Sequence, residues 1–85
     1  MSEQAYHIQG FTDLDDAKIC YWKDKDGHWL LYLPNCGVGN LSNHQVTEHE
    51  DGTISVTPSI RVTGHDHGSQ VIRHGNLTRG VWVEA

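Results

Sequence analysis

Apolar and polar residues alternate along much of this chain, with the period of two that is typical of a β-strand. The clearest example spans residues 28–33, where both faces are apolar. One face carries Trp29, Leu31 and Leu33, and the other carries Leu30 and Tyr32. Two apolar faces are typical of a strand in the middle of a sheet. Pro34 ends this strand, because proline has no N–H to donate to a neighbour.

Further segments have strand-like patterns, and short turn sequences separate them. We predict these strands at residues 17–23, 43–49, 53–62, 71–74 and 77–84. We predict turns or loops at residues 24–27, 35–40, 50–52, 64–69 and 75–76. Pro58 falls in phase with the apolar residues of the 53–62 segment, and it indicates a bulge or an edge there.

Residues 1–16 are polar and have no apolar repeat, so we expect a loosely ordered arm in which Thr12 caps a short helical turn. The rest of the pattern predicts a single domain over residues 1–85 that is mostly β, with little helix. We expect a small antiparallel meander that closes into a barrel or folds into a sandwich. Parallel strands are not expected, because no crossover helix is visible.

The chain is acidic, with a net charge of -5 when its seven histidines are neutral. Direct binding to nucleic acid needs clustered Lys and Arg, and the chain has only six such residues. Protonation of all seven histidines would move the charge from -5 to +2, at about pH 6. We therefore expect no direct nucleic-acid partner. An acidic surface keeps a protein in solution, or mimics nucleic-acid charge toward another protein.

The sequence has no feature of a membrane or secreted protein. No apolar stretch approaches the roughly 20 residues of a membrane span. Residues 1–10 have neither the basic nor the apolar region of a signal peptide. We therefore expect a cytoplasmic protein with no membrane partner, in which Cys20 and Cys36 stay reduced.

A histidine-rich loop provides the strongest chemical signal. His65 and His67 share a face if the loop is extended, and His74 follows seven residues later. With Cys36 from the glycine-containing loop, these residues would suit tetrahedral zinc. No Cys-x-x-Cys pair accompanies them, so a solvent-exposed polar turn is the alternative. A second pair, His44 and His49, is five residues apart and would point to opposite faces of a strand.

A small hydrolase is a further alternative. Cys36 would be its nucleophile, with one of the histidines as base and Asp66 nearby, which requires a thiol of low pKa. The sequence has no nucleophile elbow of the Gly-x-Ser-x-Gly type, and residue types alone rarely identify a site.

Three tryptophans and three tyrosines are many aromatic residues for this length. Core packing explains most of them. Val81 and Val83 flank Trp82, so one of the two faces of that segment is expected to be exposed or covered by a partner. We therefore predict a protein-binding surface that includes Trp82, Tyr32 and Trp29. A small sheet with free edges also favours self-association into a homo-oligomer.

Two segments, His-Glu-Asp-Gly-Thr-Ile-Ser-Val-Thr-Pro-Ser-Ile at residues 49–60 and His-Gly-Asn-Leu-Thr-Arg-Gly-Val-Trp at 74–82, resemble small proteins common in phage and prophage genomes. Those proteins are similar to a broader β-rich family of unknown function with a Pro-Ser-Ile element. Some members carry zinc-binding Cys/His sets, whose cysteine pairs are missing here. The resemblance implies no activity, but it implies an accessory protein of an infected bacterial cytoplasm.

The first functional hypothesis is therefore a non-enzymatic binding module that contacts a host protein, or a second copy of itself, with an inhibitory effect as one outcome. The alternatives are a zinc-binding domain and a small cysteine-dependent hydrolase.

Overall fold

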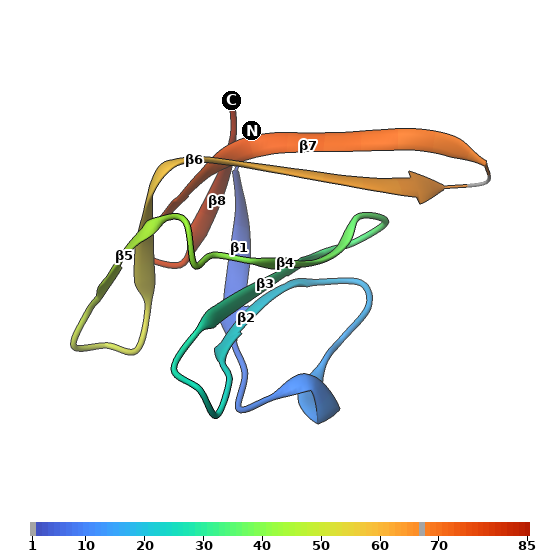
Figure 1. Ribbon diagram of the computed structural model, residues 1–85. Helices are drawn as coiled ribbons and strands as arrows, with labels where there is room; N and C mark the ends of the chain where they lie inside the picture. Colours follow the sequence, from blue (N-terminus) through green and yellow to red (C-terminus); the bar gives the residue numbers. More distant parts are fainter. Residues whose placement is uncertain (1, 67) are drawn as a thin grey trace.

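The computed structural model describes residues 2–66 and 68–85. Its strands are β1 (Ser2–His7), β2 (Ile19–Lys23), β3 (Trp29–Leu33), β4 (Gly37–Asn40), β5 (Gln45–Glu48), β6 (Ile54–Asp66), β7 (Ser69–Thr78) and β8 (Val81–Glu84), and a short 3-10 helix, η1, spans Phe11–Asp13. The strands form one sheet in the order β4-β3-β2-β1-β8-β7-β6-β5, which curls into a half-barrel (Figure 1). The prediction of a small, mostly β protein with little helix is confirmed.

The strand β1 lies in the middle of the sheet, between β2 and β8 (Figure 1). Residues 2–7 therefore belong to the sheet, and the prediction of a loosely ordered arm is wrong for them. The sequence pattern gives no sign of this strand, because Ala5 is its one buried residue and the others are exposed. The Ala5 N–H donates to the Gly80 carbonyl at 2.8 Å, which ties β1 to the turn between β7 and β8.

One strand pair departs from the antiparallel pattern. β1 and β2 are parallel, whereas the other pairs of the described sheet are antiparallel. A parallel pair needs a connection that returns to the starting end of the first strand. Here residues 8–18, which we call the crossing loop, provide that connection, and η1 takes the place of a longer helix. The N-cap of η1 is Gly10 and not Thr12, because the helical turn starts two residues earlier than expected.

The hydrophobic core lies on the inner, concave face of the half-barrel. β3 has the predicted alternation, with Trp29, Leu31 and Leu33 buried and the residues between them partly exposed. The core consists of Ala5, Ile19, Tyr21, Trp29, Leu31, Leu33, Leu41, Ile54, Val56, Ile60, Leu77 and Trp82. Burying these side chains provides the main stabilisation of a sheet of this size.

β6 and β7 form a long two-stranded ribbon that extends beyond the rest of the sheet (Figure 1). Their register shifts between Val56 and Ile60, which confirms the bulge predicted at Pro58. The ribbon also corrects two predicted turns. Residues 64–66 and 69 continue the strands, so the predicted 64–69 loop is mostly strand. Residues 75–76 lie inside β7, and the chain turns instead at Arg79 and Gly80, which both have positive φ.

Gly75 is inside a strand because its lack of a side chain makes room for Trp82. A Cβ at this position would lie 2.8 Å from Cζ2 of Trp82 and would also collide with the Val83 carbonyl. The Gly-Asn pair is typical of a hairpin turn, but here the glycine allows close packing of β7 on β8.

The predicted loop at residues 35–40 is also wrong, because residues 37–40 form the edge strand β4. Its two glycines weaken the strand pattern in the sequence. The turn before β4 packs on the inner face of β6, where a Cβ at Gly64 would collide with the backbone of Asn35 and Cys36. This contact brings one end of the sheet close to the β6–β7 ribbon.

We predict that Gly75→Ala destabilises the fold by about 1–3 kcal/mol, because the added methyl group must displace Trp82 or the β8 backbone. Gly10→Ala is the matched control, since a Cβ there meets no atom within 4 Å. Its effect should stay within about 0.5 kcal/mol. Urea denaturation of both variants measures the difference. Equal stability of Gly75→Ala and the parent would contradict the close packing described here.

Candidate protein-binding surface

Of the four proposed zinc ligands, the structure describes the side chains of Cys36 and His74, and it places them apart. Cys36 packs against the core on the inner face of the sheet. His74 lies on the outer face of β7, where its Nε2 is 2.8 Å from the Ser59 hydroxyl. Because these two residues lie on opposite faces of the β6–β7 ribbon, they cannot share one metal ion. The side chain of His65 and the whole of His67 lie outside the described part of the chain.

A different group of possible ligands lies in the turn between β2 and β3. Asp24, Asp26 and His28 place one ligand atom each within 4.8 Å of one another. Asp24 Oδ1 already accepts the N–H groups of Asp26 and His28, each at 2.9 Å. The N–H of His28 contributes most to a pKa of Asp24 below its usual value. The local geometry of this group is that of a turn closed by an aspartate side chain.

Cys36 does not have the low pKa that a catalytic thiol requires. Burial raises the pKa of the Cys36 thiol above its ordinary value, and the nearby Arg73 charge only partly opposes this. A thiol with a raised pKa is mostly protonated at neutral pH and is a weak nucleophile. Both Cys36 and the buried Cys20 are free. The Asp66 side chain of the hydrolase hypothesis lies outside the described part of the chain.

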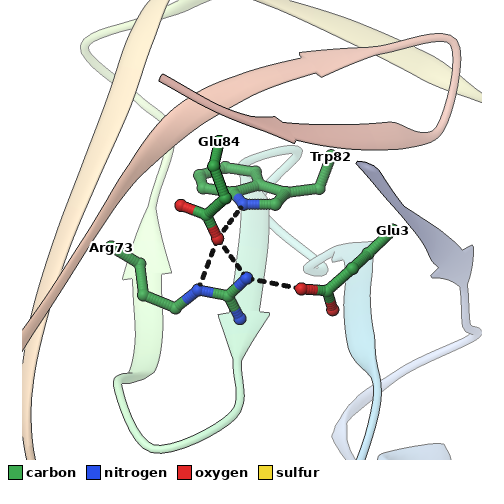
Figure 2. A network of polar contacts seen from close by, with 4 residues as sticks. All are labelled: Glu3, Arg73, Trp82 and Glu84. Carbon is green, nitrogen blue, oxygen red and sulfur yellow. Dashed lines mark hydrogen bonds and ion pairs between the residues drawn. The ribbon is translucent and has the colours of Figure 1, made fainter. Parts of the chain in front are cut away.

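Trp82 is a core residue, and its prediction as an exposed binding residue is wrong. Its exposed fraction is 0%. Figure 2 shows the polar contacts that hold the buried ring in place. Glu84 accepts hydrogen bonds from Trp82 Nε1 and from Arg73 Nε, each at 2.9 Å. Arg73 Nη2 also donates to Glu3 at 2.7 Å. The guanidinium carbon of Arg73 lies 5.9 Å from the centre of the Trp82 ring. The strand alternation instead exposes Val83 on the opposite face.

Trp29 is also buried, with an exposed fraction of 8%, so it too is wrong as an exposed binding residue. The Lys23 ammonium lies 5.3 Å from the centre of its ring and forms an ion pair with Glu48 at 2.9 Å. His7 covers another side, with ring centres 5.4 Å apart. These contacts close the inner face near the start of β3.

Of the three predicted binding residues, Tyr32 alone lies on the outer face. It is opposite Cys20 on β2 and Val38 on β4, and residues directly opposite each other share a face. In the same way Trp22 is opposite Leu30. The Phe11 ring of the crossing loop packs edge-on against Trp22, with ring centres 6.3 Å apart. We call the group Phe11, Trp22, Leu30, Tyr32 and Val38 the outer apolar surface.

Two residues of the outer apolar surface are strongly exposed. Phe11 is 65% exposed and Val38 is 46% exposed, whereas Trp22, against which Phe11 packs, is buried. Leu30 and Tyr32 are partly exposed between them. Sequence reasoning missed both exposed residues because each belongs to a segment that was expected to be irregular. The one available signal was an isolated Phe among polar residues at the start of the chain.

A shallow pocket of about 430 Å³ lies elsewhere, beside the turn between β5 and β6. Glu48, His49, Glu50, Asp51 and Arg79 line it. His49 Nε2 is 2.7 Å from Ser55 Oγ, which accepts the Arg79 N–H at 2.9 Å. These bonds join two turns of the sheet. His44 is not part of this group, since its Nε2 lies 3.3 Å from the Ser59 carbonyl.

Comparison with models of protein families, with curated proteins and with solved structures found no match to this chain. Within residues 2–66 and 68–85, no helix has the length and apolar character needed to cross a membrane. The surface geometry is therefore the basis for assigning a function.

We predict that Glu84→Gln lowers the stability of the fold by about 1–3 kcal/mol at neutral pH, because it weakens the charged hydrogen bonds to the partly buried Arg73. Burial by itself raises the pKa of Glu84, but the hydrogen bonds from Arg73 and Trp82 outweigh it, and the pKa lies below its ordinary value. A lowered pKa contributes stability above the unfolded-state pKa of about 4.3, and this contribution is lost as the pH falls through the folded-state pKa.

The measurement for Glu84→Gln is urea denaturation at several pH values. The gap between the variant and the parent should be constant above about pH 5 and should shrink below about pH 4. Glu50→Gln is the control, because Glu50 is exposed. A gap that does not change with pH would show that the ionised Glu84 is not the stabilising form.

We also predict that Cys36 reacts with iodoacetamide more slowly than free cysteine at about pH 8, because its raised pKa leaves less thiolate. Cys36→Ser identifies which part of the reaction belongs to this thiol, since Cys20 is 1% exposed. A rate above that of free cysteine would support the hydrolase alternative.

Proposed function

We propose that this chain is a non-enzymatic protein-binding module, and that the outer apolar surface is where its partner binds. One observation carries the proposal: Phe11 and Val38 expose 65% and 46% of their surface beside further apolar side chains on β2 and β3. Isolated exposed apolar residues are ordinary on protein surfaces, but a group of them around an aromatic ring is typical of a binding site.

The underlying structure of this surface is well suited to binding. Trp22 and Cys20 are buried although they face outward, because the crossing loop covers them. The Tyr32 hydroxyl donates to the Asp16 carbonyl at 3.0 Å, and the Cys20 sulfur lies 3.6 Å from the Lys18 carbonyl. These contacts hold the loop against the strands, so Phe11 is presented from a supported position. A partner that binds there loses less conformational entropy than one that must order a free loop.

The role of a phage-type accessory protein in a bacterial cytoplasm belongs to this proposal. It draws on the resemblance of residues 49–60 and 74–82 and on the acidic charge. A small module without a catalytic thiolate would act by occupying a surface of another protein, and inhibition is then a direct consequence of binding. The zinc and hydrolase alternatives have less support, since Cys36 and His74 lie on opposite faces and the Cys36 pKa is raised.

The test of this proposal uses two substitutions of equally exposed residues. Val38 on the outer apolar surface and Ile72 on β7 are each 46% exposed. We expect a protein captured from bacterial lysate by the parent and by Ile72→Asp to be lost with Val38→Asp. With the purified partner, Val38→Asp should weaken binding by about tenfold or more, the effect of losing a buried apolar anchor.

Phe11→Ser provides a second variant that does not alter the sheet. Circular dichroism and light scattering of each variant confirm that fold and oligomeric state are unchanged. A partner that is retained by Val38→Asp and Phe11→Ser but lost with Ile72→Asp would place the binding site on the opposite half of the sheet and contradict the proposal.

A further inference from the structure

The crossing loop that borders the outer apolar surface is acidic. Residues 8–18 contain Asp13, Asp15 and Asp16 but a single cation, Lys18. Lys18 is already engaged, since its ammonium lies 3.8 Å from Asp15 and 4.9 Å from the centre of the Tyr6 ring. Asp13 and Asp16 form no ion pair with any described residue. The border of the surface therefore has an excess of negative charge.

These carboxylates lie close to the apolar residues. Asp13 belongs to η1 together with Phe11, and the backbone of Asp16 accepts the Tyr32 hydroxyl. The negative charge of the crossing loop also acts on the Tyr32 side chain. Its pKa is raised, first by burial and then by the negative charges of Asp16 and Asp15. An ionised group on a bound partner would experience the same field, which favours cations and disfavours anions.

We propose that the outer apolar surface binds a protein segment in which an apolar side chain is flanked by Lys or Arg. This inference rests on the proposed function and identifies the chemistry of the partner. The apolar side chain contacts the outer apolar surface at Phe11 or at Val38, and the flanking cations lie beside Asp13 and Asp16. Charge complementarity of this kind raises association rates and selects among partners that share an apolar anchor.

The same charges argue against a second copy of this chain as the occupant. Two copies meeting through this surface would each bring Asp13, Asp15 and Asp16 to the interface. Like charges across an interface are unfavourable, and they make that pairing weaker than binding to a basic segment. Self-association of this protein would have to use a different face.

The experiment measures binding of two fluorescent peptides by anisotropy. One alternates leucine with lysine, and the other alternates leucine with glutamate. We expect the lysine peptide to bind at least about tenfold more tightly, and its dissociation constant to rise between about 50 and about 300 mM salt. Equal binding of both peptides, or no effect of salt, would overturn the inference.

A matched pair of variants separates the local charges from the net charge. Asp13→Lys/Asp16→Lys and Asp26→Lys/Glu50→Lys both change the net charge from -5 to -1, since each substitution adds two units. The double variant Asp13→Lys/Asp16→Lys should weaken lysine-peptide binding by about tenfold or more. The double variant Asp26→Lys/Glu50→Lys should weaken it by about threefold or less. Equal loss in both would overturn the inference, because binding would then depend on net charge alone.

Val38→Asp distinguishes failure of this inference from failure of the proposed function. If the two peptides bind equally well but Val38→Asp abolishes binding of both, the surface binds proteins without selecting basic ones. If Val38→Asp has no effect on lysine-peptide binding while Ile72→Asp does, the proposed surface is wrong, and the inference about its partner fails with it.

Discussion

The half-barrel depends on the insertion of β1 between β2 and β8. Without β1 the chain would consist of two separate groups of strands, β2–β4 and β5–β8, each with a long unpaired edge. β1 satisfies both edges at once, in parallel toward β2 and antiparallel toward β8. Unpaired strand edges leave backbone N–H and C=O groups available for aggregation, so this single strand protects both halves. The bond from Ala5 to Gly80 extends the connection to the turn that follows β7.

The parallel pairing has a direct consequence for the outer face. A parallel neighbour requires a crossover connection, and residues 8–18 provide it over the outer face of β2 and β3. The crossing loop therefore covers Trp22 and Cys20, places Phe11 against Trp22, and brings Asp15 and Asp16 close to Tyr32. The candidate surface is thus a product of the topology. An antiparallel hairpin in this place would have left β2 and β3 uncovered and the acidic residues in a short turn.

The inner face shows a different use of charge. Arg73, Glu84 and Glu3 surround the buried Trp82 ring (Figure 2). The Glu84 carboxylate accepts hydrogen bonds from Trp82 Nε1 and Arg73 Nε, and it also forms an ion pair with Arg73 Nη2. A buried indole needs a partner for its N–H, and a carboxylate is a strong acceptor. The network gives Trp82 one orientation, which is compatible with the glycine at position 75. The tryptophan that looked like a binding residue is therefore a fixed part of the core.

Local sequence patterns determined several features of this protein. The alternation in β3, the end of that strand at Pro34, the turn at Gly52 and the bulge near Pro58 all follow from the conformational limits of individual residues and from the period of a strand. The alternation of apolar and polar residues, together with the turn sequences between the segments, was enough to predict a mostly β fold. These features depend on neighbours within a few positions, so a single sequence contains the necessary information.

Tertiary structure alone decided which polar segments join the sheet and which aromatic residues are exposed. β1 and β4 have weak patterns, and they are strands because neighbouring strands supply their hydrogen-bond partners. Gly75 lies within β7 because the Trp82 ring, seven residues later, occupies the space of a side chain. Burial of Trp29 and Trp82 and exposure of Phe11 likewise depend on contacts with other strands and with the crossing loop. Such contacts join residues far apart in the chain, and the pattern around any one residue does not contain them.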